Sequence, residues 1–329
     1  MGGASRQTCA ATFPPNRFYC LLDKLPLHLI PRWSAKSLQK AIEEKLFLNP
    51  ECRISHAEDW PSDLGLHPEM LTGFASTGTV AWVRDPATLS LLPFWLGPKL
   101  AAVVSSLSPG EPAREMLPED ARFLLAAAGI LTPYNHADQR ISEWQNVVRN
   151  AAPVFLEKGY VPLRNLIHPF HVAALRRYYR SLIRRGEVHL GDNSSSRRYV
   201  AHNESVARFF HHQIARTVSA IAGEPIKPSY VYVASYLSGA ELHKHTDREQ
   251  CEFSVTLCLD FSPEPALETS WPIRLDTPHG AVAVYQALGD GLLYRGTQVP
   301  HHRDALSQGR TSTSIFFHYV PADFTGPLN

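Results

Sequence analysis

The spacing of hydrophobic residues changes from helical to alternating at Pro228. Beyond it, apolar and polar residues alternate in short runs, which is typical of β-strands rather than helices. Turn residues such as Ser238-Gly239 and Gly289-Asp290-Gly291 separate these runs. The runs cover 229–237, 251–259, 281–286, 291–295 and 311–320. Many short strands with turns between them predict a jelly-roll barrel or sandwich over about 228–321.

Two amphipathic helices are predicted before the strands. The first begins at Pro169 and ends at Gly186, and the second is capped by Asn203 and ends at Gly223. We expect both to pack against the outer face of the barrel. The arginines of the first helix predict a solvated face rather than a nucleic-acid contact; they are Arg176, Arg177, Arg180, Arg184 and Arg185.

The first half of the chain is less regular. Ser34 is a candidate cap for a helix with Leu38, Ile42 and Leu46 on one face, and further helices are predicted over about 118–128 and 141–148. Many prolines between residues 50 and 115 disfavour long helices there. The predicted fold class is therefore α+β, with a mainly helical accessory region over 1–150 and a barrel domain with supporting helices over 151–329.

Charge and cysteine content exclude several classes of function. The 329 residues carry a net charge of +1, which gives no reason to expect nucleic acid or acidic membranes as partners. No apolar run reaches the length of a membrane span. The five cysteines are an odd number without disulfide or zinc spacing, which indicates reduced thiols in a cytoplasmic protein.

One segment of the barrel carries two residues that suit a metal. His245 and Asp247 are two residues apart in a strand-like run, so alternation places both side chains on one face. His243 shares that face and is an alternative ligand. The carboxylate two residues after His245 favours His245. A His-x-Asp pair alone is a weak signal.

A third ligand is expected from a strand beside this pair. His301 and His302 follow the Gly-Asp-Gly turn by about ten residues, and either can supply the second imidazole. Two imidazoles and one carboxylate on one face of iron leave three positions open, the ligand set of non-haem Fe(II) oxygenases. Arg310 and Ser312 then share one side of the last strand, and a guanidinium with a hydroxyl suits a carboxylate.

Residues 228–321 resemble the barrel of the Fe(II)/2-oxoglutarate-dependent oxygenases, and in particular their prolyl-4-hydroxylase-like branch. The run Pro300-His301-x-Arg303 is also similar to related enzymes and favours His301 over His302. Two departures, Leu242 in place of an aromatic and Arg310 in place of a lysine, put prolyl residues in doubt as the substrate. The matching residues are Tyr236, Gly239, His245, Asp247, Gly289, Asp290, His301, Arg310 and Ser312.

This resemblance implies roles for individual residues. His245, Asp247 and His301 would bind Fe(II). Arg310 and Ser312 would hold the remote carboxylate of the co-substrate 2-oxoglutarate, and Tyr236 would lie near it. The co-oxidant would be O2, and the carboxylate at Asp247 favours hydroxylation over halogenation.

The resemblance also implies a reaction class. We expect hydroxylation, desaturation or cyclisation at an unactivated C–H bond of an amino acid, a peptide or a specialised metabolite, with release of succinate and CO2. The accessory region would recruit the substrate, act as a lid or form a homodimer. A cupin-like barrel that binds a metal or a sugar without oxidation is the alternative, and a catalytically silent barrel is a third reading.

Overall fold

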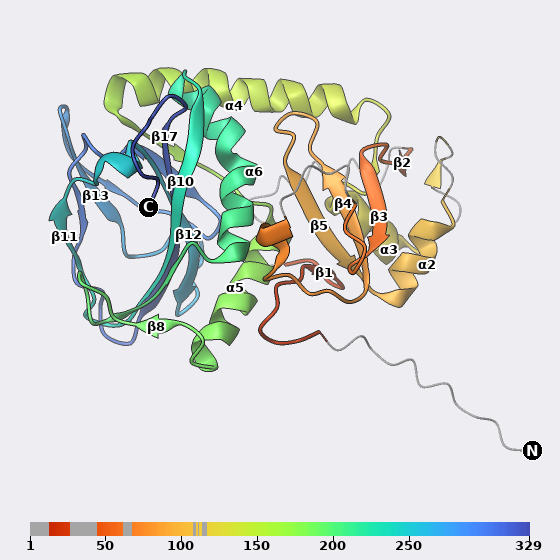
Figure 1. Cartoon of the computed structure of the whole chain (residues 1–329). Coiled ribbons are helices and arrows are strands. Elements are labelled where there is room, and N and C mark those ends of the chain that lie inside the picture. Colours follow the sequence, from red (N-terminus) through yellow and green to blue (C-terminus); the bar gives the residue numbers. More distant parts are fainter. Residues whose placement is uncertain (1–12, 27–44, 62–67, 108–109, 111, 114–116) are drawn as a thin grey trace, which may run out of the picture.

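The structure is a computed structural model, and it describes residues 13–26, 45–61, 68–107, 110, 112–113 and 117–329. It has mixed α and β elements in mostly antiparallel sheets. Figure 1 shows a β-rich C-terminal half and an N-terminal half with a smaller sheet, with two helices between them.

The larger C-terminal sheet has seven strands, and every neighbouring pair is antiparallel. The strands predicted from alternation at 229–237, 251–259, 291–295 and 311–320 all lie here, with ends that differ by a few residues. The order is β7 (Tyr160–Leu163), β15 (Gly291–Arg295), β12 (Phe253–Ser262), β17 (Thr311–Pro321), β10 (Ile226–Tyr236), β9 (Arg198–His202) and β8 (His189–Leu190).

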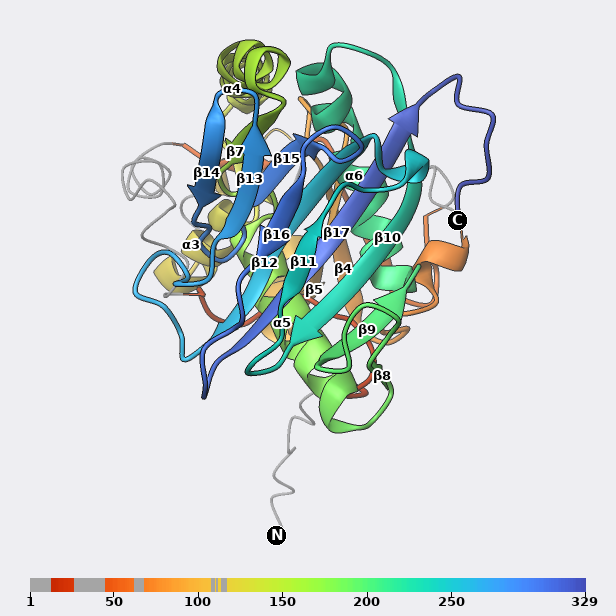
Figure 2. The ribbon, with the colours of Figure 1, turned by 90° about the vertical axis from the view of Figure 1, so that its left-hand side faces the viewer.

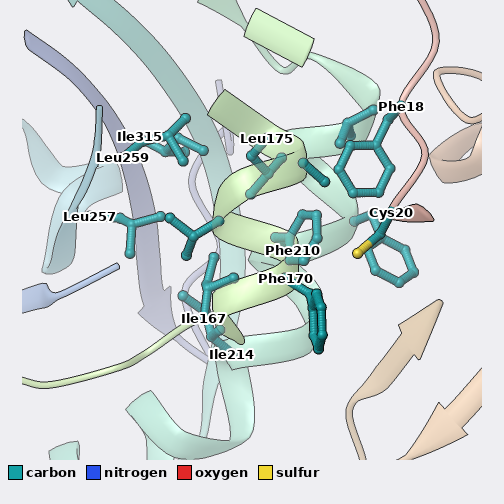
Figure 3. Close-up of a cluster of buried hydrophobic side chains, with 14 of the residues drawn as sticks. Phe18, Cys20, Ile167, Phe170, Leu175, Phe210, Ile214, Leu257, Leu259 and Ile315 are labelled. Carbon is teal, nitrogen blue, oxygen red and sulfur yellow. The ribbon is translucent and has the colours of Figure 1, made fainter. Parts of the chain in front are cut away.

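A four-stranded sheet faces the larger one (Figure 2). Alternation along the strands divides their side chains between two environments. On β12, Ser254 and Thr256 point into the space between the sheets, where Thr256 Oγ1 lies 3.4 Å from Tyr294 Oη. Leu257 and Leu259 point to the opposite face (Figure 3). The order of the smaller sheet is β11 (Leu242–His245), β16 (His301–Arg303), β13 (Ile273–Thr277) and β14 (Gly280–Val284).

Helices α5 (Pro169–Arg184) and α6 (Ser205–Ala222) cover the outer face of the larger sheet, as predicted. Figure 3 shows Leu175 of α5 close to Ile315 and Leu259 of the sheet. The predicted cap of α6 is wrong by one residue. Glu204 accepts hydrogen bonds from the backbone N–H groups of Val206 and Ala207 and is the N-cap.

The arginines of α5 do not all lie on a solvated face, and Arg176 corrects that prediction. Its side chain is 6% exposed and forms an ion pair with Asp260 at 2.9 Å, and Arg180 binds the same carboxylate. A β-bulge between Cys258 and Asp260 explains the contact, because the extra residue turns Asp260 from the inner face of β12 towards α5.

The described part of residues 1–150 is not mainly helical, so the prediction of a mainly helical accessory region is wrong. It contains a four-stranded sheet in the order β1 (Leu21–Leu22), β5 (Leu91–Leu96), β4 (Thr79–Arg84) and β3 (Cys52–His56), and a small pair of β2 (Phe47–Leu48) with β6 (Leu131–Thr132). The helical elements here are η3 (Pro68–Leu71), α2 (Pro98–Ser105), α3 (Glu119–Ala127) and α4 (His136–Lys158).

Helix α4 runs along both halves (Figure 1) and includes residue 150, the predicted boundary. The predicted helix over 118–128 corresponds to α3, and the one over 141–148 lies inside α4. The helix predicted from Ser34 lies outside the described residues, apart from Leu46, which is buried. Among the described residues, no helix combines the length and apolarity needed to cross a bilayer.

One hydrophobic core joins the two halves. Phe18 of the N-terminal half packs edge-on against Phe210 of α6, with ring centroids 5.7 Å apart (Figure 3). His171 of α5 is fully buried in this core, and its Nε2 lies 2.9 Å from the carbonyl oxygen of Pro93 on β5. Its Nδ1 is buried without a hydrogen-bond partner. The helices therefore connect the N-terminal sheet to the larger C-terminal sheet.

We expect His171 to make the stability of the chain sensitive to acid. Burial lowers its pKa from 6.5 to about 4. Between these two pH values the folded chain keeps His171 neutral, whereas the unfolded chain binds a proton. The stabilisation is complete above pH 6.5 and is lost as the pH falls towards 4, by up to about 3 kcal/mol. Urea unfolding across this range should show a smaller loss for His171→Gln, which retains a donor for Pro93 and does not titrate. Equal losses in the variant and the wild type would contradict the prediction.

Candidate metal centre

Two short strands bring the predicted ligands together. Strands β11 and β16 are antiparallel neighbours, and His245 lies opposite His301 in their register. Asp247 follows β11, and its backbone N–H donates to the carbonyl oxygen of Gly296 at 2.8 Å. This bond holds the Asp247 loop against the turn that leads to β16.

The three side chains converge on one point. Their ligand atoms all lie within 4.8 Å of one another. Asp247 Oδ1 lies 3.6 Å from His245 Nε2 and 3.5 Å from His301 Nε2. The side chain of His301 is 2% exposed, that of Asp247 13% and that of His245 39%. The cluster therefore opens to solvent on the side of His245.

Backbone carbonyls set the tautomer of both imidazoles. His245 Nδ1 lies 2.7 Å from the carbonyl oxygen of His243, and His301 Nδ1 lies 3.0 Å from that of Val299. A carbonyl oxygen only accepts, so each Nδ1 must carry the proton. Each Nε2 then presents its lone pair towards Asp247, as a neutral histidine ligand requires. The donor set thus fits a divalent metal bound by two nitrogens and one carboxylate.

Further residues hold the carboxylate in place. Ser254 Oγ donates to Asp247 Oδ2 at 2.8 Å and lies 2.9 Å from His318 Nδ1. Since the single hydroxyl proton of Ser254 goes to the carboxylate, His318 must be the donor to Ser254. Tyr294 Oη lies 3.4 Å from His301 Nε2 and is buried.

The charges in the cluster favour an ionised Asp247. Burial works to raise its pKa, but the imidazoles of His245 and His301 hold that pKa well below its usual range. The neighbouring carboxylate of Asp247 raises the pKa of His245 in turn. A proton and a metal therefore compete for Nε2 of His245. His318 remains neutral, since burial lowers its pKa to about 4.

The alternative histidines lie apart from the cluster. The side chain of His243 is 79% exposed and lies 3.5 Å from Glu241. His302 follows His301 on β16 and therefore points away from the side that His301 occupies. Within the described residues, neither belongs to a group that could hold a metal ion.

The two residues predicted to bind the remote carboxylate differ in their surroundings. Ser312 is 4% exposed and lies opposite Tyr236 in the register of β17 and β10. Arg310 precedes β17, and its Nη1 donates to the hydroxyl of the exposed Ser270 at 2.8 Å. Tyr236 is fully buried, and its Oη accepts from Arg198 Nη1 at 3.1 Å.

Several residues of this interior received no firm role from the sequence. His318 and Tyr294 lie on predicted strands, but alternation alone does not distinguish them from core residues. The spacing could have predicted the position of Arg303. It lies two residues after His301 on one strand, so the two side chains share a face. It is 4% exposed.

No family model matches the chain, and no curated protein matches it. Among solved structures, it is similar to SnoN, a non-haem α-ketoglutarate-dependent epimerase from nogalamycin biosynthesis, with a TM-score of 0.46 and 15% identity over 54% of this chain and 84% of SnoN. A prolyl-4-hydroxylase from Pseudomonas putida is similar with a TM-score of 0.43 and 16% identity, over 52% of this chain and 98% of the hydroxylase. HygX from Streptomyces hygroscopicus, solved with nickel, 2-oxoglutarate and hygromycin B, is similar with a TM-score of 0.43 and 13% identity, over 54% of this chain and 88% of HygX. Because identity and TM-score are low, we infer function from the donor set itself.

Proposed function

We propose that this chain is an Fe(II)- and 2-oxoglutarate-dependent oxygenase whose two facing sheets form a double-stranded β-helix. The convergence of His245, Asp247 and His301, with both Nε2 atoms turned towards one carboxylate oxygen, carries the proposal. Three protein ligands leave open positions for a bidentate co-substrate and for O2.

His245, Asp247 and His301 would hold the iron. When bound, iron and 2-oxoglutarate supply the oxidation of an unactivated C–H bond by O2, with release of succinate and CO2. The chain itself orients the ligands. The carbonyl oxygens of His243 and Val299 fix the imidazoles, and Ser254 fixes the carboxylate.

The same residues limit access of water. His301 and Tyr294 are buried between the two sheets, whereas His245 is partly exposed. The substrate would therefore approach from the side of His245. The proposed substrate is an amino acid, a peptide or a small specialised metabolite. The proposed reaction is hydroxylation, because Asp247 supplies a carboxylate ligand.

We also propose a cytoplasmic location. Cys20, Cys52, Cys251 and Cys258 are free and buried, which suits a reducing compartment. We further propose that this chain forms a homodimer.

The test of the proposed function uses two measurements on the wild-type chain. Without oxygen, addition of Fe(II) and 2-oxoglutarate should produce a metal-to-ligand charge-transfer band that chelators abolish. In air, the same mixture should convert 2-oxoglutarate to succinate. A metal- or sugar-binding cupin would bind the ion but give neither signal. Absence of both the band and succinate would reject the oxygenase.

A further inference from the structure

Arg303 is a buried cation that lies beside the proposed iron ligands. It occupies the same strand face as His301, two residues along β16, and is 4% exposed. Residues two apart in a strand are about 7 Å apart. The guanidinium therefore belongs to the space between the two sheets that also holds the metal ligands.

The hydrogen bonds of Arg303 leave one edge of the guanidinium only partly paired. Nη1 donates to the carbonyl oxygen of Trp271 at 2.7 Å, and the group lies over the Trp271 ring, 4.7 Å from its centroid. Nη2 makes only a long contact with Gln286 Oε1, at 3.4 Å. Nε is buried and has no hydrogen-bond partner. The neutral contacts thus orient the guanidinium, while Nε lacks a partner and Nη2 makes only one long hydrogen bond.

Two other buried arginines, Arg198 and Arg176, donate to carboxylates from this edge. Arg198 is 6% exposed, and its Nε and Nη2 both donate to Asp192 Oδ2, at 2.9 and 2.5 Å. Arg176 is 5% exposed and binds Asp260 and Glu264. Among the described residues, no carboxylate forms an ion pair with Arg303. A buried charge without a counter-charge is costly, so an acidic ligand would relieve this cost.

We propose that Arg303, rather than Arg310, binds the remote carboxylate of 2-oxoglutarate through its Nε–Nη2 edge. This proposal rests on the proposed oxygenase function and adds the residue that selects the co-substrate. A five-carbon keto acid bound to a metal held by His301 would have a remote carboxylate within reach of Arg303, which lies about 7 Å from His301 along β16. Two parallel N–H groups match both oxygens of a carboxylate.

The position of Arg310 supports this assignment. Its guanidinium already donates to the exposed Ser270, and it lies 5.8 Å from the ring centroid of Phe261. It therefore offers a carboxylate a solvated contact, which is weaker than a buried one. Ser312, by contrast, is buried and remains available as an additional donor.

The test compares two keto acids that differ in the remote carboxylate. Anaerobic titrations of the Fe(II)-loaded chain with 2-oxoglutarate and with pyruvate, followed by the charge-transfer band, give the two dissociation constants. We expect Arg303→Met to weaken 2-oxoglutarate binding by at least about 30-fold, because a buried charge pair is lost. Pyruvate binding should be unchanged, which also reports an intact metal centre.

Two further variants make the result decisive. Arg303→Lys keeps the charge but loses the fork, so it should bind 2-oxoglutarate more weakly than the wild type and more tightly than Arg303→Met. It also serves if Arg303→Met does not fold. Arg310→Gln is the matched control and should retain the preference for 2-oxoglutarate.

The outcomes separate this assignment from the proposed function. A loss of preference in Arg310→Gln with none in the Arg303 variants would overturn the role of Arg303 and leave the oxygenase intact. Equal losses for both keto acids in the Arg303 variants would assign Arg303 a structural role only. No band with either keto acid in the wild type would reject the oxygenase itself.

Discussion

Replacing His301 with alanine is expected to lower the Fe(II) affinity of the chain by at least about 100-fold, because even residues that only orient a ligand typically contribute 10- to 100-fold. His301 is the most buried of the three candidate ligands, and its Nε2 lies 3.5 Å from Asp247 Oδ1. Its removal would leave one imidazole and one carboxylate, which hold a metal weakly. Titration of Fe(II) into the metal-free variant without oxygen measures the loss.

His302→Ala is the matched control, because it removes the adjacent imidazole from the same strand. His302 is half-buried and points away from the side of Asp247 and His245, so its loss should leave the Fe(II) affinity unchanged. If His302→Ala lost the metal and His301→Ala retained it, the ligand set would be wrong. Equal, partial losses in both variants would indicate a general disturbance of β16 rather than the loss of a ligand.

The residues that the sequence could predict are those governed by a local period. Alternation predicts His245 and Asp247 on one face, and their ligand atoms lie 3.6 Å apart, although β11 ends at His245 and Asp247 lies in the loop that follows. Helical spacing similarly predicts α5 and α6 and the faces that they bury. The same alternation occurs at Ile273–Thr277, where Ile and Leu alternate with charged residues, but the predicted strands do not include this segment, which forms β13.

The remaining features depend on contacts between distant segments. Strand β16 has only three residues, and the register with β11 decides that His301 rather than His302 lies opposite His245. The N-terminal sheet was missed because β4 and β5 are short apolar runs, buried along most of their length, which show no clean alternation. The unpaired Nε of Arg303 depends on which distant side chains surround it, which no local pattern records.

A glycine beside the cluster shows how closely the backbone surrounds the carboxylate. Gly296 N–H donates to the carbonyl oxygen of Glu252, and its own carbonyl oxygen accepts from Asp247 N–H. A methyl group added at Gly296 would overlap with Asp247 Oδ2 and the carbonyl oxygen of Cys251, and would lie 2.7 Å from Ser254 Oγ. The Cys251 oxygen belongs to the backbone and moves little, so both the backbone at residue 296 and the Asp247 carboxylate would have to shift.

Gly296→Ala is therefore expected to reduce Fe(II) affinity by about 10- to 100-fold, the range seen when the groups that orient a ligand are disturbed. Overpacking should also lower the free energy of unfolding by about 1–3 kcal/mol. Anaerobic Fe(II) titration and urea unfolding measure the two effects on one sample. Gly97→Ala is the control, since a methyl group there meets no atom within 4 Å and should leave metal binding intact. Wild-type Fe(II) affinity in Gly296→Ala would show that Asp247 does not need its present position, and hence that it is not a ligand.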